Sequence, residues 1–323
     1  MISPQLSSSD SHLPKQDAPS TVSVVINSYN YGRYLPRAIE SALRQRTATM
    51  SVEVVVVDDG STDRTPEVAA EYSGEIRYHR QPNGGQAAAI QKGIGLASGE
   101  ILCLLDADDE FVEGKVQQVV AAFQNAPQYG AIYNSCERVD GDGKSLGPPF
   151  VWSLAGRDVR QLGLFWLAVG VPTSCISLRR EVAHRLAIPE EFRICADSYI
   201  SAALPHLTEI GWLGVPLTTY RVHGANAFAV LNPSGQKRLL QKNWRTIRSA
   251  MMRQYGVELS KAVFEIQEQR ERRSVLGTVA YCAEGLRYIH RAKASPSLKL
   301  RETVKLVAAA VGLHKPLIAH SQQ

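Results

Sequence analysis

Short runs of β-branched residues alternate with helical stretches from residue 21 onward, and this alternation limits the possible folds more than any other feature. The strand-like runs lie at 22–26, 52–57, 76–79, 101–105 and 130–134. Such spacing is typical of βαβ units, in which parallel strands are buried between helices. We therefore predict an α/β fold with a mostly parallel sheet flanked by helices.

The pattern is less regular after residue 135. The elements expected there are a hairpin turn at 140–143, a strand at 173–178, a helix near 198–204 and an edge strand at 215–222. From residue 232 onward the sequence is helical, with breaks at Gly256, Pro296 and Gly312. A C-terminal helical region is therefore expected to follow the sheet.

The composition indicates a globular chain without disulfides or membrane spans. With 44% hydrophobic and 21% charged residues among 323, the chain can form a packed core. The five cysteines are scattered without a C-x-x-C pair, which indicates reduced thiols in a cytosol. Residues 1–20 lack a signal-peptide pattern and are expected to be a disordered tail. The longest apolar stretch, 162–171, is far shorter than the ~20 residues of a membrane span, so we expect a cytoplasmic protein.

Charge is distributed unevenly along the chain. Residues 234–323 contain 17 Lys and Arg and 6 Asp and Glu, a net charge of +11. Residues 1–233 contain 19 Lys and Arg and 25 Asp and Glu, a net charge of −6. A basic region of this kind suits a membrane surface, an acidic partner or nucleic acid, or is simply a solvated face. No nucleic-acid-binding motif accompanies it, so we expect no nucleic-acid partner.

Polar turns follow three of the predicted strands, at 27–30, 58–63 and 106–109. In an open α/β sheet, ligands bind beyond the carboxyl ends of the strands, where these turns would lie together. One such turn is explained by geometry alone, because Asp, Asn and Gly are common turn residues. Three turns at one edge, two of them with adjacent carboxylates, favour a bound cation, because like charges repel.

Asp106 and Asp108 are two residues apart, so in extended backbone their side chains leave on one side and can reach one ion. Carboxylate oxygens suit Mg²⁺ or Mn²⁺, which keep positions open for phosphate oxygens. A metal held in this way neutralises a diphosphate leaving group, as in transfer from a nucleotide-sugar.

Two other nucleotide motifs do not fit the sequence. The nearest P-loop candidate, 143–145, has Arg138 in place of the first glycine and follows no strand-to-helix turn. Gly93 and Gly95 begin like a dinucleotide fingerprint, but they lie at the end of a helix and the third glycine, Gly99, is one place late.

Four motifs, in their order and spacing, resemble glycosyltransferase family 2. They are VSVVINSYN at 22–30, VVVVDDGSTD at 54–63, NGGQAAAIQKG at 83–93 and SGEILCLLDADD at 98–109. The resemblance covers roughly residues 20–225. It implies a GT-A fold, a nucleotide-sugar donor, a divalent metal (Mn²⁺ or Mg²⁺) and inversion at the anomeric carbon.

The resemblance also implies roles for individual residues. The donor-side residues would be Asn27, Ser28, Tyr29, Asn30, Asp58, Asp59, Gly84, Gly85, Gln86, Asp106, Ala107 and Arg221. In this set, Asp58 or Asp59 would contact the nucleoside, and the glycines would let the backbone approach the diphosphate. The metal ligands would be Asp108, Asp106 and His223, the last from a Tyr-Arg-x-His segment at 220–223 that resembles the end of many family catalytic domains. For Arg221 and His223, a salt bridge at an edge strand is the alternative.

The general base is expected at Asp197. An acceptor hydroxyl needs a carboxylate within hydrogen-bond reach to take its proton. Asp197 matches the Asp of a Glu-Asp pair common in the family, with Ala196 in place of the Glu. Capping of the helix that follows is the alternative role for Asp197. The sequence also departs from the family at Asn27, where many members have proline, and at 90–91, where many carry Arg-Asn or a similar polar pair.

The resulting prediction is a metal-dependent inverting glycosyltransferase that acts on a saccharide or lipid-linked acceptor, with unknown oligomeric state. The expected organisation is a tail at 1–20, a nucleotide-sugar-binding half at 21–135, an acceptor-binding half at 136–231 and a basic helical region at 232–323. A non-catalytic nucleotide-sugar-binding or scaffold member is one alternative. A nucleotidyltransferase is another, but it should carry a basic glycine-rich loop after the first strand, and 27–32 has no basic residue. The amphipathic stretch 298–313 suits peripheral membrane contact, or packing against the catalytic domain or a dimer partner.

Overall fold

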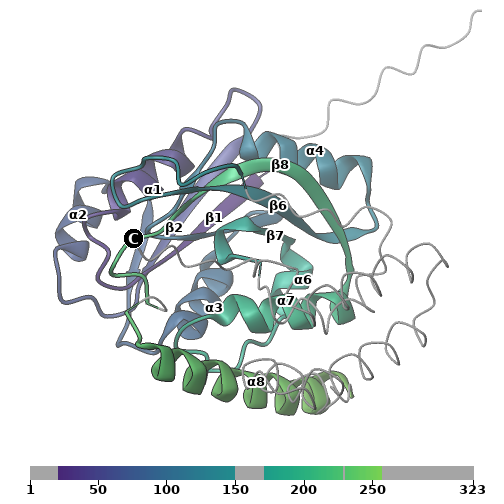
Figure 1. Cartoon of the computed structure of the whole chain (residues 1–323). Helices are drawn as coiled ribbons and strands as arrows, with labels where there is room; N and C mark the ends of the chain where they lie inside the picture. The colour runs from purple at the N-terminus through teal and green to yellow at the C-terminus, as the bar shows by residue number, and fades with distance from the viewer. Residues whose placement is uncertain (1–20, 150–170, 228–229, 257–323) are drawn as a thin grey trace, which may run out of the picture.

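The computed structural model describes residues 21–149, 171–227 and 230–256, and in these ranges an eight-stranded mixed sheet lies between two layers of helices (Figure 1). The strand order is β3-β2-β1-β4-β7-β6-β8-β5. Four of its seven pairings are parallel (β1–β2, β1–β4, β2–β3 and β6–β8) and three are antiparallel (β4–β7, β6–β7 and β5–β8). The predicted α/β architecture is therefore confirmed.

The N-terminal half consists of βα units, as the alternation of β-branched and helical segments predicts. Its strands are β1 (Thr21–Ser28), β2 (Ser51–Asp58), β3 (Arg77–Arg80) and β4 (Ile101–Asp106). Its helices are α1 (Leu35–Leu43), α2 (Thr65–Glu71), α3 (Gln86–Leu96) and α4 (Lys115–Asn125). Thr65 does not cap α2 as its type would suggest; the helix begins at Thr65, and the Asp63 carboxylate accepts hydrogen bonds from its N–H and hydroxyl.

The second half adds strands that run in both directions. Its elements are β5 (Glu110–Phe111), β6 (Tyr129–Val139), η1 (Thr173–Cys175), β7 (Ile176–Arg179), α6 (Arg180–Arg185), α7 (Ala196–Leu207), β8 (Glu209–Arg221) and α8 (Pro233–Tyr255). The helix α8 ends at Gly256, as predicted, in the left-handed conformation that glycine adopts readily.

The expectation of an edge strand at 215–222 is wrong. The strand β8 is longer, begins at Glu209 and is paired on both sides, by β6 and by the two-residue β5. Its proline, Pro216, lies where the β6–β8 register shifts. A proline is tolerated inside a sheet at such an irregularity, because a ladder hydrogen bond is already missing there.

The hydrophobic core lies on both faces of the sheet. On one face, α1, α2 and α4 pack against residues such as Val24, Val54 and Leu105. On the other face, α3, α6 and α7 pack against residues such as Val25 and Leu104, and α8 covers α7 from outside (Figure 1). Buried on both faces, β1, β2 and β4 can be nearly continuous apolar runs that end in polar turns. The edge strand β3 is partly exposed and polar.

Several expectations fall on residues outside the described ranges: the tail at 1–20, the apolar stretch at 162–171 apart from Val171, and the amphipathic stretch at 298–313. Among the helices of the described ranges, none combines the length and apolar character of a bilayer-spanning segment.

Candidate active site

The three polar turns meet at one edge of the sheet, because β1, β2 and β4 are adjacent parallel strands. In the strand register Asn27 is the partner of Asp106, and Ser28 is the partner of Asp58. The side chains also meet, since Asn27 Nδ2 donates to Asp106 Oδ1 at 2.9 Å. The edge therefore brings together residues 79 positions apart, as the strand pattern predicts.

Three carboxylates crowd together after β4. One oxygen from each of Asp106, Asp108 and Asp109 lies within 4.8 Å of the others. Burial, with the nearby charge of Asp108, raises the pKa of Asp106 to about 7 and raises that of Asp109 well above its usual range. Crowded carboxylates whose ionised form is disfavoured by burial and by one another's charge fit a hard divalent cation, whose charge would favour the ionised form.

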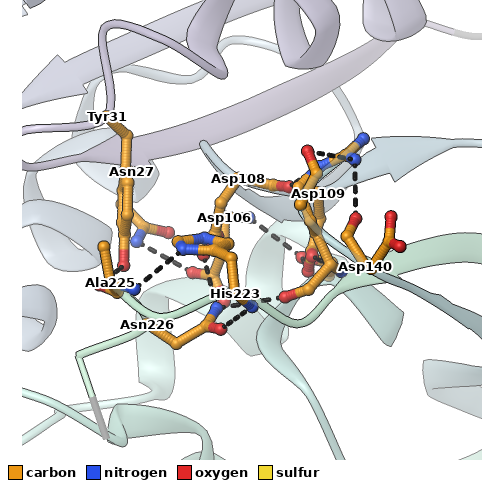
Figure 2. Close-up of polar contacts among 12 residues, drawn as sticks. Asn27, Tyr31, Asp106, Asp108, Asp109, Asp140, His223, Ala225 and Asn226 are labelled. Atoms are coloured by element: carbon orange, nitrogen blue, oxygen red, sulfur yellow. Dashed lines mark hydrogen bonds and ion pairs between the residues drawn. The ribbon is translucent and has the colours of Figure 1, made fainter. Parts of the chain in front are cut away.

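Asp108 is held by the loop that follows β8 (Figure 2). Its Oδ2 lies 3.1 Å from His223 Nε2 and accepts a hydrogen bond from Asn226 Nδ2 at 3.0 Å. The Ala225 N–H donates to His223 Nδ1, so in the neutral ring Nε2 carries the proton and donates to Asp108. In this arrangement His223 is a hydrogen-bond partner of the expected metal ligand, and binding an ion itself would require Nε2 to lose that proton.

Two tyrosines of the first turn fix the His223 ring. The ring centroids of Tyr34 and His223 are 4.5 Å apart, and Tyr31 approaches the same ring edge-on at 5.8 Å. The Tyr31 hydroxyl also donates to the Ala225 carbonyl. The turn after β1 and the loop after β8 therefore close over the carboxylate cluster from two sides.

Arg221 is buried, with 1% of its side chain exposed, and holds the backbone of the acidic turn. It pairs with Glu110 through Nη2, and its Nε donates to the Asp108 carbonyl at 3.1 Å. Its Nη1 donates to the carbonyls of Asp140 and Gly141, so each guanidinium nitrogen has a protein acceptor. This geometry agrees with the salt-bridge alternative for Arg221. It does not leave a guanidinium nitrogen free to bind a diphosphate.

Asp109 is likewise used within the protein. Its Oδ1 accepts from the Arg221 N–H at 2.8 Å, and its Oδ2 accepts from Ser174 Oγ at 2.6 Å. Ser174 Oγ also accepts from the Asp106 N–H at 3.0 Å. These contacts join the acidic turn to η1 and to the end of β8, which sets the position of the carboxylate cluster.

The acidic pair after β2 organises its own turn. Asp58 accepts from the Ser61 N–H at 2.8 Å and from the Tyr78 hydroxyl at 2.6 Å, and lies 3.5 Å from Arg80 Nε. Asp59 accepts from the backbone N–H groups of Gly84 at 2.8 Å and Gly85 at 2.6 Å. Asp59 thereby holds the glycine-rich loop against the end of β2.

Two buried polar atoms at the same edge lack partners. Among the described residues, Asn27 Oδ1 and Ser28 Oγ form no hydrogen bond. A buried polar atom left unpaired costs about 1–3 kcal/mol, and a bound ligand or a water molecule can supply the partner. By contrast, Tyr29 is exposed, and Asn30 Oδ1 accepts from the Thr62 N–H at 2.7 Å.

Gln86 connects the carboxylate cluster to the segment that carries Asp197. Its Nε2 donates to Asp106 Oδ1 at 3.0 Å and to Thr173 Oγ1 at 3.3 Å. Its Oε1 accepts from the N–H of Ala196, the first residue of α7. The side-chain amide therefore bridges β4, η1 and α7.

Asp197 lies in the first turn of α7, where its Oδ1 accepts from the Ser198 N–H at 2.8 Å. Burial raises its pKa to about 6. The preceding residue, Cys195, has a left-handed backbone with φ of 59°, which is uncommon for a residue with a side chain. The helix begins at Ala196 with Cys195 as its N-cap, so Asp197 is not the capping residue, although it accepts from a first-turn N–H. The charge of Asp197 helps to raise the pKa of Asp106, so Asp197 lies near the carboxylate cluster and the catalytic role stays a prediction.

The comparisons with known proteins agree with this architecture. A family model described as "Glycosyl transferase family 2" matches residues 23–187, more than half of the chain. The chain belongs to glycosyltransferase family 2. An uncharacterized glycosyltransferase of Nostoc sp. is 36% identical over 217 residues, which are 64% of this chain and 66% of that protein. The hyaluronan synthase of Pasteurella multocida is 30% identical over 152 residues, 46% of this chain but only 15% of the synthase.

Solved structures of Staphylococcus aureus TarS share the fold of this family 2 glycosyltransferase. The match with the structure of TarS 1–349 has a TM-score of 0.52 at 16% identity. It covers 90% of this chain and 72% of the TarS chain. A complex of the same protein with UDP-GlcNAc gives the same TM-score and identity.

The family 2 motifs predict which strand ends come together but miss the residues that hold them in place. Ser174, Gln86 in its bridging role, Asn226 and the pair Tyr31 and Tyr34 were not predicted. Asn226 offers a local signal, because it lies three residues after His223 in the same loop. Ser174 offers none, because it lies 65 residues from its partner Asp109.

Proposed function

We propose that this chain transfers a sugar, with inversion, from a nucleoside-diphosphate donor to a hydroxyl of a saccharide or lipid-linked acceptor, with the help of Mn²⁺ or Mg²⁺. The observation that carries the proposal is the crowding of Asp106, Asp108 and Asp109 at the ends of parallel strands, beside unpaired polar atoms of Asn27 and Ser28. The complexes of TarS with UDP-GlcNAc and with UDP support a nucleotide-sugar donor on the same fold.

On the donor side, Asp106 and Asp108 would hold the ion, because an oxygen of each lies within 4.8 Å of an oxygen of the other. The bound ion would offset the negative charge of the departing diphosphate. Asn27 Oδ1 and Ser28 Oγ would bind the nucleotide, since both are buried at this edge without a protein partner. Asp59 would act indirectly, by accepting from the N–H groups of Gly84 and Gly85 and so fixing the glycine-rich loop beside the end of β2.

On the acceptor side, Asp197 would act as the general base. A group with a pKa of about 6 is largely ionised near pH 7 and still basic enough to accept a proton in the transition state. The acceptor oxygen would attack the anomeric carbon from the face opposite the diphosphate. As the new C–O bond forms and the bond to the diphosphate breaks, the hydroxyl proton passes to Asp197.

The proposal includes the predicted division of labour between the halves of the chain. The half at 21–135 supplies Asn27, Gln86 and the acidic turn, and the half at 136–231 supplies Asp197 and His223. A cytoplasmic location, with peripheral contact at a membrane that carries the acceptor, belongs to the same proposal.

The test is release of nucleoside diphosphate from a panel of UDP-, GDP- and dTDP-sugars with Mn²⁺, against a parallel reaction with EDTA. We expect Mn²⁺-dependent release, and a loss of about 100-fold in Asp108→Asn, equivalent to about 2.7 kcal/mol of transition-state stabilisation. Glu71→Gln, which neutralises an exposed carboxylate at the end of α2, is the matched control and should behave as wild type.

Undiminished turnover in EDTA, or full activity of Asp108→Asn, would contradict metal dependence. Transfer of a nucleotidyl group instead of a sugar would favour the nucleotidyltransferase alternative. Nucleotide-sugar binding without any turnover, across donors and acceptors, would favour a non-catalytic member.

A further inference from the structure

The helix α8 has an unusual charge for a helix that packs on a domain. Its 23 residues include six basic and no acidic side chains: Lys237, Arg238, Lys242, Arg245, Arg248 and Arg253. Nothing in the proposed transfer reaction uses this charge. It is the described part of the basic region that the sequence sets apart at 234–323.

The orientation of α8 is fixed by its apolar face. Trp244, Ile247 and Met251 are buried, and the last two join the same core cluster as Tyr199 of α7. The opposite face therefore points away from α7, and among the described elements Figure 1 shows α8 as the outermost helix on this side of the sheet.

The outward face carries a basic stripe, which we define as Arg238, Lys242 and Arg245. All three side chains are exposed, and their spacing of four and three residues places them on one side of the helix. Together with Gln241 and Thr246 they line a depression of about 350 Å³. Within the described ranges, none of the ion pairs involves these three residues.

The charge of the stripe limits what can cover it. Residues 257–323 contain 11 basic and 6 acidic residues. Their net charge of +5 has the same sign as the stripe and does not complement it. A second copy of the chain that met it face to face would present the same positive charges. An external anionic partner is therefore the better match.

Among anionic partners, a lipid surface fits best. Met252 lies seven residues after Arg245, on the same side of α8 as the stripe, and is 46% exposed. An apolar side chain among basic ones is typical of helices that lie in the headgroup region. Anionic headgroups attract each nearby Lys or Arg by about 1 kcal/mol.

The position of α8 also suits a lipid-borne acceptor. Its inner face contacts the segment before α7, where Asn243 Nδ2 donates to the Ile194 carbonyl at 3.4 Å and Gln254 Nε2 donates to the Ala187 carbonyl at 3.1 Å. That segment leads directly to Asp197, the proposed base. A bilayer at the stripe would therefore lie on the acceptor side of the enzyme.

We propose that the basic stripe of α8 is an electrostatic docking surface for an anionic lipid bilayer. The test is co-sedimentation of the full 323-residue chain with vesicles of phosphatidylcholine containing 30% phosphatidylglycerol, at low and high NaCl. The variant is Arg238→Gln/Lys242→Gln/Arg245→Gln. The control, Arg44→Gln/Lys92→Gln/Arg180→Gln, removes three charges from exposed positions elsewhere.

We expect the wild-type chain and the control to bind at low salt and to release at high salt, because screening weakens surface attraction. The stripe variant should partition about 100-fold more weakly, since three charges each contribute about fivefold. Circular dichroism and thermal melting of each variant confirm that it is folded before the comparison is made.

Three outcomes would overturn the proposal: no binding of the wild-type chain to anionic vesicles, equal binding to pure phosphatidylcholine, or equal binding of the stripe variant and the wild type. Capture by soluble heparin without vesicle binding would assign the stripe to an acidic macromolecule instead. Because the assay involves no turnover, its result is independent of whether the proposed transfer reaction is correct.

Discussion

Replacing Gln86 tests whether the glycine-rich loop binds the donor or positions the catalytic groups. The resemblance to family 2 suggests a donor-side residue, whereas in the structure both ends of the side-chain amide are occupied by Asp106, Thr173 and the Ala196 N–H. We predict that Gln86→Ala lowers kcat far more than it raises KM for the donor. The reason is that the bridge sets the distance between the proposed metal ligand Asp106 and the α7 turn that carries Asp197.

The size of the effect follows from the contacts that are lost. A hydrogen bond to a carboxylate contributes about 1.5–3 kcal/mol, and one between neutral groups about 1 kcal/mol. Water entering the space left by the side chain recovers part of this, so we expect a loss of about 2 kcal/mol in the free energy of unfolding. Misplacement of Asp197 by about 1 Å lowers kcat by about 100-fold.

The assay is initial-rate release of nucleoside diphosphate over a range of donor concentrations, with urea unfolding on the same samples. Gln91→Ala is the matched control, because it removes the same side chain from the same helix, α3. A second variant, Gln86→Glu, keeps an acceptor for the Ala196 N–H but places a carboxylate 3.0 Å from Asp106, and should be at least as damaging.

The opposite kinetic pattern would refute the reasoning. If Gln86→Ala raised KM for the donor tenfold and left kcat unchanged, the residue would contribute uniform binding of the donor and the bridge would have no catalytic role. Unchanged values of both, with Gln91→Ala also unchanged, would show that the bridge is dispensable.

Two further predictions concern the same part of the site. Gly85→Ala should lower the free energy of unfolding by about 2 kcal/mol more than Gly74→Ala in urea titrations. Both glycines have a positive φ, 92° and 89°. A Cβ at Gly85 would lie 2.5 Å from Arg193 Cα, whereas a Cβ at Gly74 would have no neighbouring heavy atom within 4 Å. Equal losses would mean that the loop before α7 moves away freely. With saturating Mn²⁺, kcat/KM should fall about tenfold per pH unit below pH 6, because burial raises the pKa of Asp197 to about 6 and only the ionised form accepts a proton. If Asp197→Asn retained that acidic limb, another group would be the base.

The elements of the first half could be predicted because their signals are local. The strand 101–105 is predicted one residue short of β4, and the helix 86–96 matches α3. The strand is a run of apolar residues that stops at Asp106, and the helix begins directly after the turn 83–85. The same local logic places 27–30 and 106–109 at one edge, since parallel strands end together.

The second half depends on strand pairings for which the sequence carries no local signal. The strand β8 pairs with β6 across a register shift and with β5, which is only two residues long. The role of Arg221 is equally non-local, because its partner Glu110 lies 111 residues earlier in the chain. An arginine next to a predicted metal ligand gives the same sequence signal whether it binds a diphosphate or supports the turn.

The edge of the sheet where these residues meet lowers the stability of the free protein. Asp106 has a folded-state pKa raised to about 7, above the value of about 3.9 for an unfolded chain. Its contribution to folding is therefore fully favourable only below the unfolded value and is lost as the pH rises toward 7. Unpaired atoms of Asn27 and Ser28 add a second cost at the same place. A divalent cation would lower the pKa of Asp106, and a nucleotide would pair the free atoms. The two ligands of the proposed reaction would thus reduce both of these costs.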